Sequence, residues 1–152
     1  MKQTTKTRSA RTAPAPVAES PDAMFALLSA AHALEERLEA AMGAVGLSMA
    51  KYGVLRCLAD AGEPLTLTDL ASQQRCVRSN ITQLIDRLEA DGFVKRVDDP
   101  DDRRSIRAAL TPLGVDRQAA GTRALTALQK EVSGLVSASD RAAVTRLLSA
   151  LK

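Results

Sequence analysis

Residues 93–111 read FVKRVDDPDDRRSIRAALT, and this stretch decides the fold. Two short segments, FVKRV at 93–97 and SIRAALT at 105–111, flank a centre in which aspartates surround a proline. Because Asp and Pro favour tight turns, the pattern predicts a β-hairpin with its tip at DDPDD. In the second segment Ile106, Ala108 and Leu110 alternate with Arg107, which predicts a strand with one buried face.

The aspartates at the hairpin tip suggest a second interpretation, a site for a divalent cation. A calcium loop spaces its carboxylates around the bend and has a glycine at the sharpest point. The tip has neither that spacing nor a glycine, and Arg103 and Arg104 follow it directly. Since these arginines would repel a cation, we expect no metal site at the tip. We also expect that the protein has no cofactor.

The segment before the hairpin predicts a helix over about residues 77–91, with Gly92 as its stop. Its apolar residues fall on one face at helical spacing: Val77, Ile81, Leu84, Ile85 and Leu88. The other face carries polar and charged side chains: Ser79, Thr82, Gln83 and Asp86, flanked by Arg78, Asn80 and Arg87. Asn and Gln pair with adenine edges and Arg pairs with guanine, so this face is suited to reading DNA bases. A solvated polar face is the alternative.

A short helix precedes this one, which favours the DNA-binding interpretation. Thr66 and Asp69 have the spacing of a capping box and open a helix to about Gln74. A tight turn at residues 75–76 then leads into the next helix, and the whole predicts a helix-turn-helix. Arginines at a hairpin tip beside such a helix can enter the adjacent minor groove, so Arg103, Arg104 and Arg107 are candidate DNA contacts.

The remaining chain predicts further helices on both sides of this unit. We expect helices at about 21–42, at 49–60 after a Ser48 cap, from Pro112 onward after a Thr111 cap, and after a Ser137 cap. The first and the last two carry apolar stripes able to pack on partner helices. The fold class is therefore mainly α with a small β-hairpin.

Composition limits the class of protein. A chain of 152 residues with 45% hydrophobic residues forms one domain with one core. No apolar run is long enough to cross a membrane and no secretory leader is present, so we expect a cytoplasmic protein with reduced thiols at Cys57 and Cys76. The net charge of +3 comes entirely from residues 1–20, which hold four basic residues and one acidic residue. We expect this segment to be a disordered basic tail.

Residues 69–114 resemble the winged helix-turn-helix of MarR-family transcription regulators. The strongest match is the wing signature D-x-R-x5-L-T, which runs here from Asp102 through Arg104 to Leu110-Thr111. The resemblance extends over 21–152, with dimerisation helices at 21–46 and 112–152 and the winged helix-turn-helix at 47–111. It implies a homodimer bound to a pseudo-palindromic operator, with Arg104 in the minor groove and Asp102 orienting it.

The resemblance also implies a repressor released by a small phenolic ligand or by oxidation of a cysteine. Cys76 lies beside Arg75 and Arg78, which would lower its thiol pKa, and it is the candidate redox residue; an apolar plug in the turn is the alternative. His32, Tyr52 and Arg56 are candidates for the ligand pocket.

We expect that the protein is not an enzyme, because neither a catalytic constellation nor a phosphate loop is present. A winged-helix module that binds proteins and not DNA is the competing function.

Overall fold

The computed structural model describes residues 22–74, 78–100, 102 and 105–150. The predicted tail at 1–20 lies outside them. The protein is mainly helical with a small antiparallel sheet, as predicted. In chain order the elements are α1 (Asp22–Gly43), α2 (Met49–Ala61), β1 (Leu65–Thr66), α3 (Leu67–Gln73), α4 (Arg78–Ala90), β2 (Val94–Asp98), β3 (Ile106–Leu110), α5 (Pro112–Leu135) and α6 (Ala138–Ala150).

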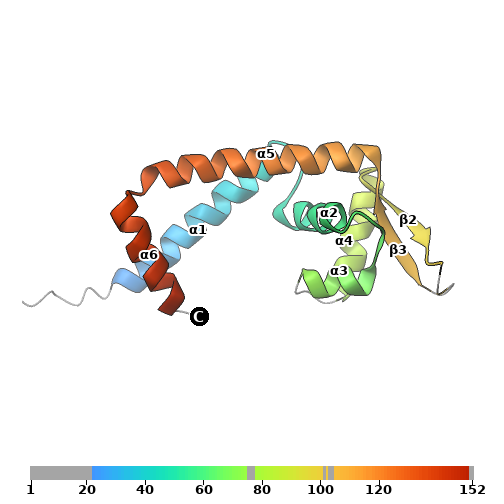
Figure 1. The fold of residues 1–152 in the computed structure, drawn as a ribbon, viewed down its shortest axis with the longest axis horizontal. Helices are drawn as coiled ribbons and strands as arrows, with labels where there is room; N and C mark the ends of the chain where they lie inside the picture. Colours follow the sequence, from blue (N-terminus) through green and yellow to red (C-terminus); the bar gives the residue numbers. More distant parts are fainter. Residues whose placement is uncertain (1–21, 75–77, 101, 103–104, 151–152) are drawn as a thin grey trace, which may run out of the picture.

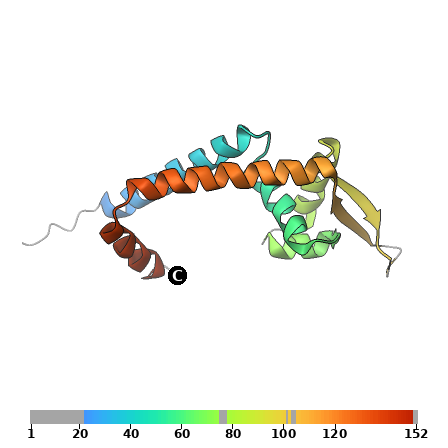
Figure 2. The same ribbon diagram turned by 45° about the horizontal axis from the view of Figure 1, so that its top comes forward.

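The long helix α5 joins two parts of the molecule (Figure 1). The elements α2 to β3 form a lobe below the N-terminal end of α5, and β2 and β3 project from that lobe as a wing. Helix α1 packs along the other part of α5, and α6 turns back from the end of α5 (Figure 2). The lobe and the helical part are thus held at opposite ends of one helix.

The lobe has an apolar core built from the stripes that the sequence predicts. Ile81, Ile85 and Leu88 of α4 are fully buried and Leu84 is half-buried, which confirms the predicted inner face of this helix from Ile81 onward. Val77, also predicted on this face, lies outside the described residues. The three fully buried residues pack with Leu55 of α2 and Leu70 of α3, which are also fully buried. Burying each such side chain stabilises the fold by about 1.5–3 kcal/mol, so α4 is firmly anchored by one face and its other face remains available.

Four helices begin at capping residues that the sequence predicts. In each case a Ser or Thr hydroxyl accepts a hydrogen bond from a backbone N–H in the first turn, which satisfies a donor that the helix itself leaves unpaired. The caps are Ser48 for α2, Thr66 for α3, Thr111 for α5 and Ser137 for α6. The predicted stop after α4 is also confirmed, because Gly92 has a φ of 75°, in the left-handed region that favours glycine.

The sheet has three strands, one more than the hairpin that the sequence predicts. The order is β1-β3-β2, and all pairs are antiparallel. Leu65 and Thr66 of β1 pair with Ala108 and Arg107 of β3. A strand of two residues has no periodicity to detect, and only the fold brings it beside β3. The extra strand ties the base of the wing to the start of α3.

The predicted inner face of β3 is correct only in its middle and C-terminal part. Ala108 is fully buried and Leu110 is half-buried, but Ile106 is 47% exposed. Ile106 pairs with Asp98 at the outer end of the sheet, beyond the register that β1 reaches. The alternation assigned Ile106 to the core because a sequence pattern does not reveal how far the wing projects past the lobe.

The first turns of α5 pack closely on α2. A side chain at Gly121 would place its Cβ 2.5 Å from the Tyr52 ring, so only glycine allows this approach. The Tyr52 hydroxyl lies 3.1 Å from Thr122 Oγ1 and completes the contact with a hydrogen bond. In addition, Arg117 Nη1 donates to the Val45 carbonyl at 2.6 Å. These contacts fix the lobe to the helical part.

Large apolar side chains remain exposed on the helices at the far end of the molecule. We call them the apolar end residues: Met24, Phe25 and Leu28 of α1, Leu135 of α5, and Val144, Leu147 and Leu148 of α6. Single exposed apolar residues are ordinary, but a concentration on three neighbouring helices is typical of an interaction surface. Within the described part of the chain, no helix is long and apolar enough to cross a membrane.

Candidate nucleic-acid interface

Helix α4 has one buried face and one exposed face, and the exposed face carries the residues predicted to bind DNA. Ser79, Asn80, Gln83 and Arg87 are exposed, and Thr82 is half-buried. Arg78 is the first residue of α4. Because the apolar face is buried in the core, the orientation of α4 is fixed and its polar side chains are presented along one ridge of the lobe.

A shallow hollow of about 320 Å³ lies beside this ridge. It is lined by Ala50, Gln74, Asn80, Gln83, Leu84 and Arg87. Gln74, which follows α3, was not among the predicted site residues. Its Nε2 donates to Cys57 Sγ at 2.9 Å, so the amide is held against α2. Sequence reasoning missed Gln74 because only the packing of α3 and α4 against α2 brings it to the polar ridge. Clustered amides and a guanidinium match the edges of adenine and guanine.

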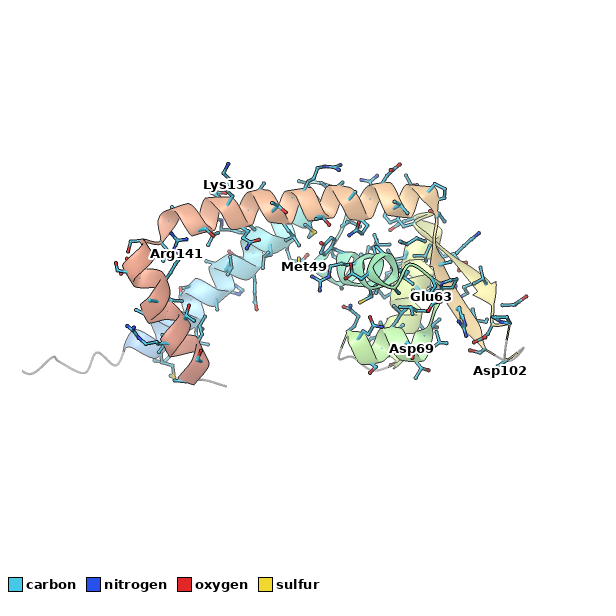
Figure 3. The ribbon with its side chains drawn as sticks, viewed as in Figure 1. Met49, Glu63, Asp69, Asp102, Lys130 and Arg141 are labelled. Carbon is cyan, nitrogen blue, oxygen red and sulfur yellow. The ribbon has the colours of Figure 1, made fainter. Side chains whose placement is uncertain are left out.

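The wing is held by hydrogen bonds near its tip. Asp99 N–H donates to the Ser105 carbonyl at 3.2 Å, and Ser105 N–H donates to the Asp102 carbonyl at 2.8 Å. Asp102 lies at the end of the wing remote from α5 (Figure 3). Arg103 and Arg104, the predicted minor-groove residues, lie outside the described residues, so their DNA contacts remain predictions.

Arg107 forms an ion pair within the wing. Its Nε lies 2.9 Å from Asp99 Oδ2, and Asp99 is only 6% exposed. A buried carboxylate needs such a partner, because an unpaired buried charge is strongly destabilising. The pair gives Arg107 a structural role in shaping the wing. A direct contact between Arg107 and DNA remains a prediction.

A second set of ion pairs joins the wing to α4. Arg96 of β2 extends one nitrogen to Asp86 Oδ1 at 2.5 Å and another to Glu89 Oε2. The hydrogen bond to Asp86 raises the pKa of Arg96 above its ordinary value, with a further contribution from Glu89 and some opposition from burial. Arg96 therefore stays charged, and Asp86 faces the wing instead of lying free on the polar ridge.

The three candidate ligand residues have separate surroundings. Tyr52 is buried at the contact between α2 and α5. His32 is exposed on α1, with Nε2 3.3 Å from Glu36 Oε1. Arg56 is exposed on α2, with Nε 3.7 Å from Asp60 Oδ2. A pocket shared by these residues therefore remains a prediction.

The candidate redox residue, Cys76, lies outside the described residues. Cys57 is half-buried and packs against the lobe core. Among the residues that the structure describes, no group of three or more His, Cys, Asp or Glu side chains is placed to hold a metal ion.

The arrangement as a whole defines a winged helix-turn-helix protein: a short helix, closely followed in the chain by a helix with an exposed polar ridge, and a wing beside it. Residues 47–106 match the model of the MarR family. The matched part of the chain holds the helix-turn-helix and most of the wing.

Several named proteins are similar to this chain in sequence. An uncharacterised HTH-type transcriptional regulator of Bacillus subtilis, YkoM, is 39% identical over 45% of this chain and 44% of its own length. The HTH-type transcriptional repressor YetL of the same organism is 40% identical over 47% of this chain and 44% of its own length. The chain thus spans about half the length of the curated relatives it matches.

Solved structures extend the likeness to most of the fold. The crystal structure of AbsC, a MarR family transcriptional regulator from Streptomyces coelicolor, is 26% identical with a TM-score of 0.71. The alignment covers 86% of this chain and 87% of that one. The likeness in fold therefore extends well beyond residues 47–106.

Proposed function

We propose that the protein is a dimeric transcription regulator that binds a specific DNA sequence and acts as a repressor. The observation that carries the proposal is the polar ridge of α4, where Ser79, Asn80, Gln83 and Arg87 are exposed while the opposite face is buried. A helix in this setting fits the major groove, and a wing beside it fits the adjacent minor groove. The relatives named as transcriptional regulators support the same conclusion.

The dimer is proposed from the apolar end residues. A stable interface buries about 800 Å² of each partner and has an apolar centre. The apolar end residues supply such side chains on α1, α5 and α6, away from the polar ridge. An apolar hollow of about 310 Å³ between α1 and α5, lined in part by Leu34 and Leu128, would receive side chains of the partner.

We further propose that a signal releases the protein from DNA. Either a small phenolic ligand or oxidation of Cys76 would serve. A ligand near Tyr52 would act where α2 meets α5, and a shift there would move the lobe relative to the dimer helices. Both signals are tested by adding phenolic carboxylates or peroxide to the protein–DNA complex and measuring dissociation.

Sequence-specific binding is tested by fluorescence anisotropy with DNA from upstream of the protein's own gene and a scrambled duplex of equal length. The Arg104→Ala and Gln83→Ala variants should each weaken binding to the specific duplex by about 1–3 kcal/mol, the usual size of one groove contact. The affinity should also fall steeply with salt, with a log–log slope of several units, because phosphate contacts release counterions.

The matched control is Arg123→Ala, which removes one positive charge from an exposed position on α5. This variant should bind like the unmodified protein. If Arg104→Ala and Arg123→Ala weaken binding equally, the wing is not a DNA contact. Weak and equal binding to both duplexes, with no effect of salt, would favour a protein-binding module.

A further inference from the structure

Helix α4 and the wing are joined by one residue of β2, Arg96. Arg96 is held by two carboxylates of α4, from Asp86 and from Glu89 one turn further on. Glu89 also accepts the backbone N–H of Arg96 at 3.2 Å. Both the side chain and the backbone of this residue are therefore fixed to α4, and we call these contacts the α4–wing clamp.

The clamp lies at the free edge of the sheet. Strand β3 is central and β2 is an outer strand, so β2 pairs with β3 on one side only. On its other side, the N–H of Arg96 is covered by Glu89 instead of by a fourth strand. An edge N–H that is satisfied by a neighbouring helix fixes the strand to that helix. The wing thus has a defined orientation along α4.

We propose that Arg96 is a positioning residue for DNA recognition, because the clamp sets the angle between the wing and α4. With that angle fixed, the helix and the wing reach adjacent grooves of one duplex without a cost for ordering the wing. The inference rests on the proposed function, because it concerns how two DNA-binding elements act together. Arg96 itself does not need to touch DNA.

The proposal is testable because it predicts whether DNA binding becomes weaker or stronger when the two acidic residues are removed. Asp86 and Glu89 lie on the helix proposed to approach DNA, and both are at least 39% exposed in their side chains. If they had no positioning role, their removal would reduce repulsion of phosphate and strengthen binding to any DNA. The clamp predicts the opposite for the specific sequence.

The experiment compares two double variants of the full chain, each of which loses two negative charges, but at different places. Asp86→Ala with Glu89→Ala removes the clamp. Asp60→Ala with Glu63→Ala removes two exposed acids elsewhere in the lobe and serves as the control. Dissociation constants are measured with the specific duplex and with a scrambled duplex. The clamp variant should bind the specific duplex about tenfold or more weakly, the size of one lost groove contact, and the scrambled duplex no more weakly than before.

Variants of Arg96 provide an independent check. Arg96→Ala should lower the ratio of specific to scrambled affinity about as much as the clamp variant does. Arg96→Lys should recover part of that ratio, because lysine keeps the positive charge that attracts the two carboxylates. The recovery should be incomplete, because an ammonium cannot contact both carboxylates in the planar manner of a guanidinium. Equal ratios for Arg96→Ala and the unmodified protein would overturn the proposal.

Amide hydrogen exchange in the free protein tests the clamp without DNA. The N–H of Arg96 should exchange faster in the clamp variant, while the buried amides of α4 around Ile85 should be unchanged. Unchanged exchange at Arg96 would show that the clamp does not hold the strand. If the unmodified protein binds all duplexes alike, the proposed function fails. If it is specific and the clamp variant binds as tightly or more tightly, only this inference fails.

Discussion

Replacing Gly114 by alanine is expected to lower the free energy of unfolding by about 2–4 kcal/mol, in the range of severe overpacking. A Cβ at this buried position would lie 1.9 Å from the Phe93 carbonyl oxygen. That oxygen also accepts the Thr111 N–H at 3.1 Å, so the backbone after α4 cannot move without breaking the contact that starts α5. The clash is with backbone, and no side-chain rotation relieves it.

The measurement is chemical denaturation followed by circular dichroism, at one protomer concentration because an oligomer's stability depends on concentration. Gly43→Ala is the control. Gly43 is the last residue of α1, and nothing lies within 4 Å of a Cβ placed there. In a helix, alanine is favoured over glycine by up to about 1 kcal/mol, so this variant should be unchanged or more stable. Equal stability of the two variants would show that α5 does not pack on Phe93 as described.

Introducing charge among the apolar end residues is expected to separate the dimer and to weaken specific DNA binding at least about 100-fold, since two linked half-site contacts become one. The variant is Leu28→Glu with Leu147→Glu. Both side chains are more than half exposed in the protomer, at 59% and 51%, so the substitutions should leave the fold intact. Buried in an interface, each carboxylate would lack a partner.

Sedimentation equilibrium measures the mass, and anisotropy measures the affinity. Leu113→Glu, at an exposed position at the start of α5 in the other part of the molecule, is the control for one added negative charge and should remain dimeric. If the double variant has the same mass as the unmodified protein, the apolar end residues do not form the interface. A monomer in both cases would mean that the chain does not dimerise.

Much of the fold follows from local chemistry and was predicted from the sequence. The caps at Ser48, Thr66 and Thr111 need only a hydroxyl three residues before a free N–H. The inner face of α4 needs only helical spacing, and the burial of Ile81 and Leu88 confirms it. The stop at Gly92 likewise follows from the one residue type that favours a positive φ. Such features depend on neighbours in the chain, which the sequence displays.

The missed features depend on contacts between distant residues. Strand β1 is too short to show a period, and Ile106 is exposed because the wing extends beyond the lobe. Gln74 reaches the polar ridge only after α3 has folded onto α2. In the sequence, Arg96 is one more basic residue in a predicted strand. It joins the wing to α4 only because Asp86 and Glu89 face it in the fold. Spacing along the chain does not specify which charges of two elements will meet.

The central claim is that the protein recognises one DNA sequence as a dimer. It is tested most directly by selecting duplexes from a random library with the full-length protein and sequencing those that remain bound in the presence of competitor DNA. We expect an enriched inverted repeat whose half-site centres lie about 10 base pairs, one helical turn, apart. A library that stays random after repeated rounds, or an enriched single site without symmetry, would contradict it.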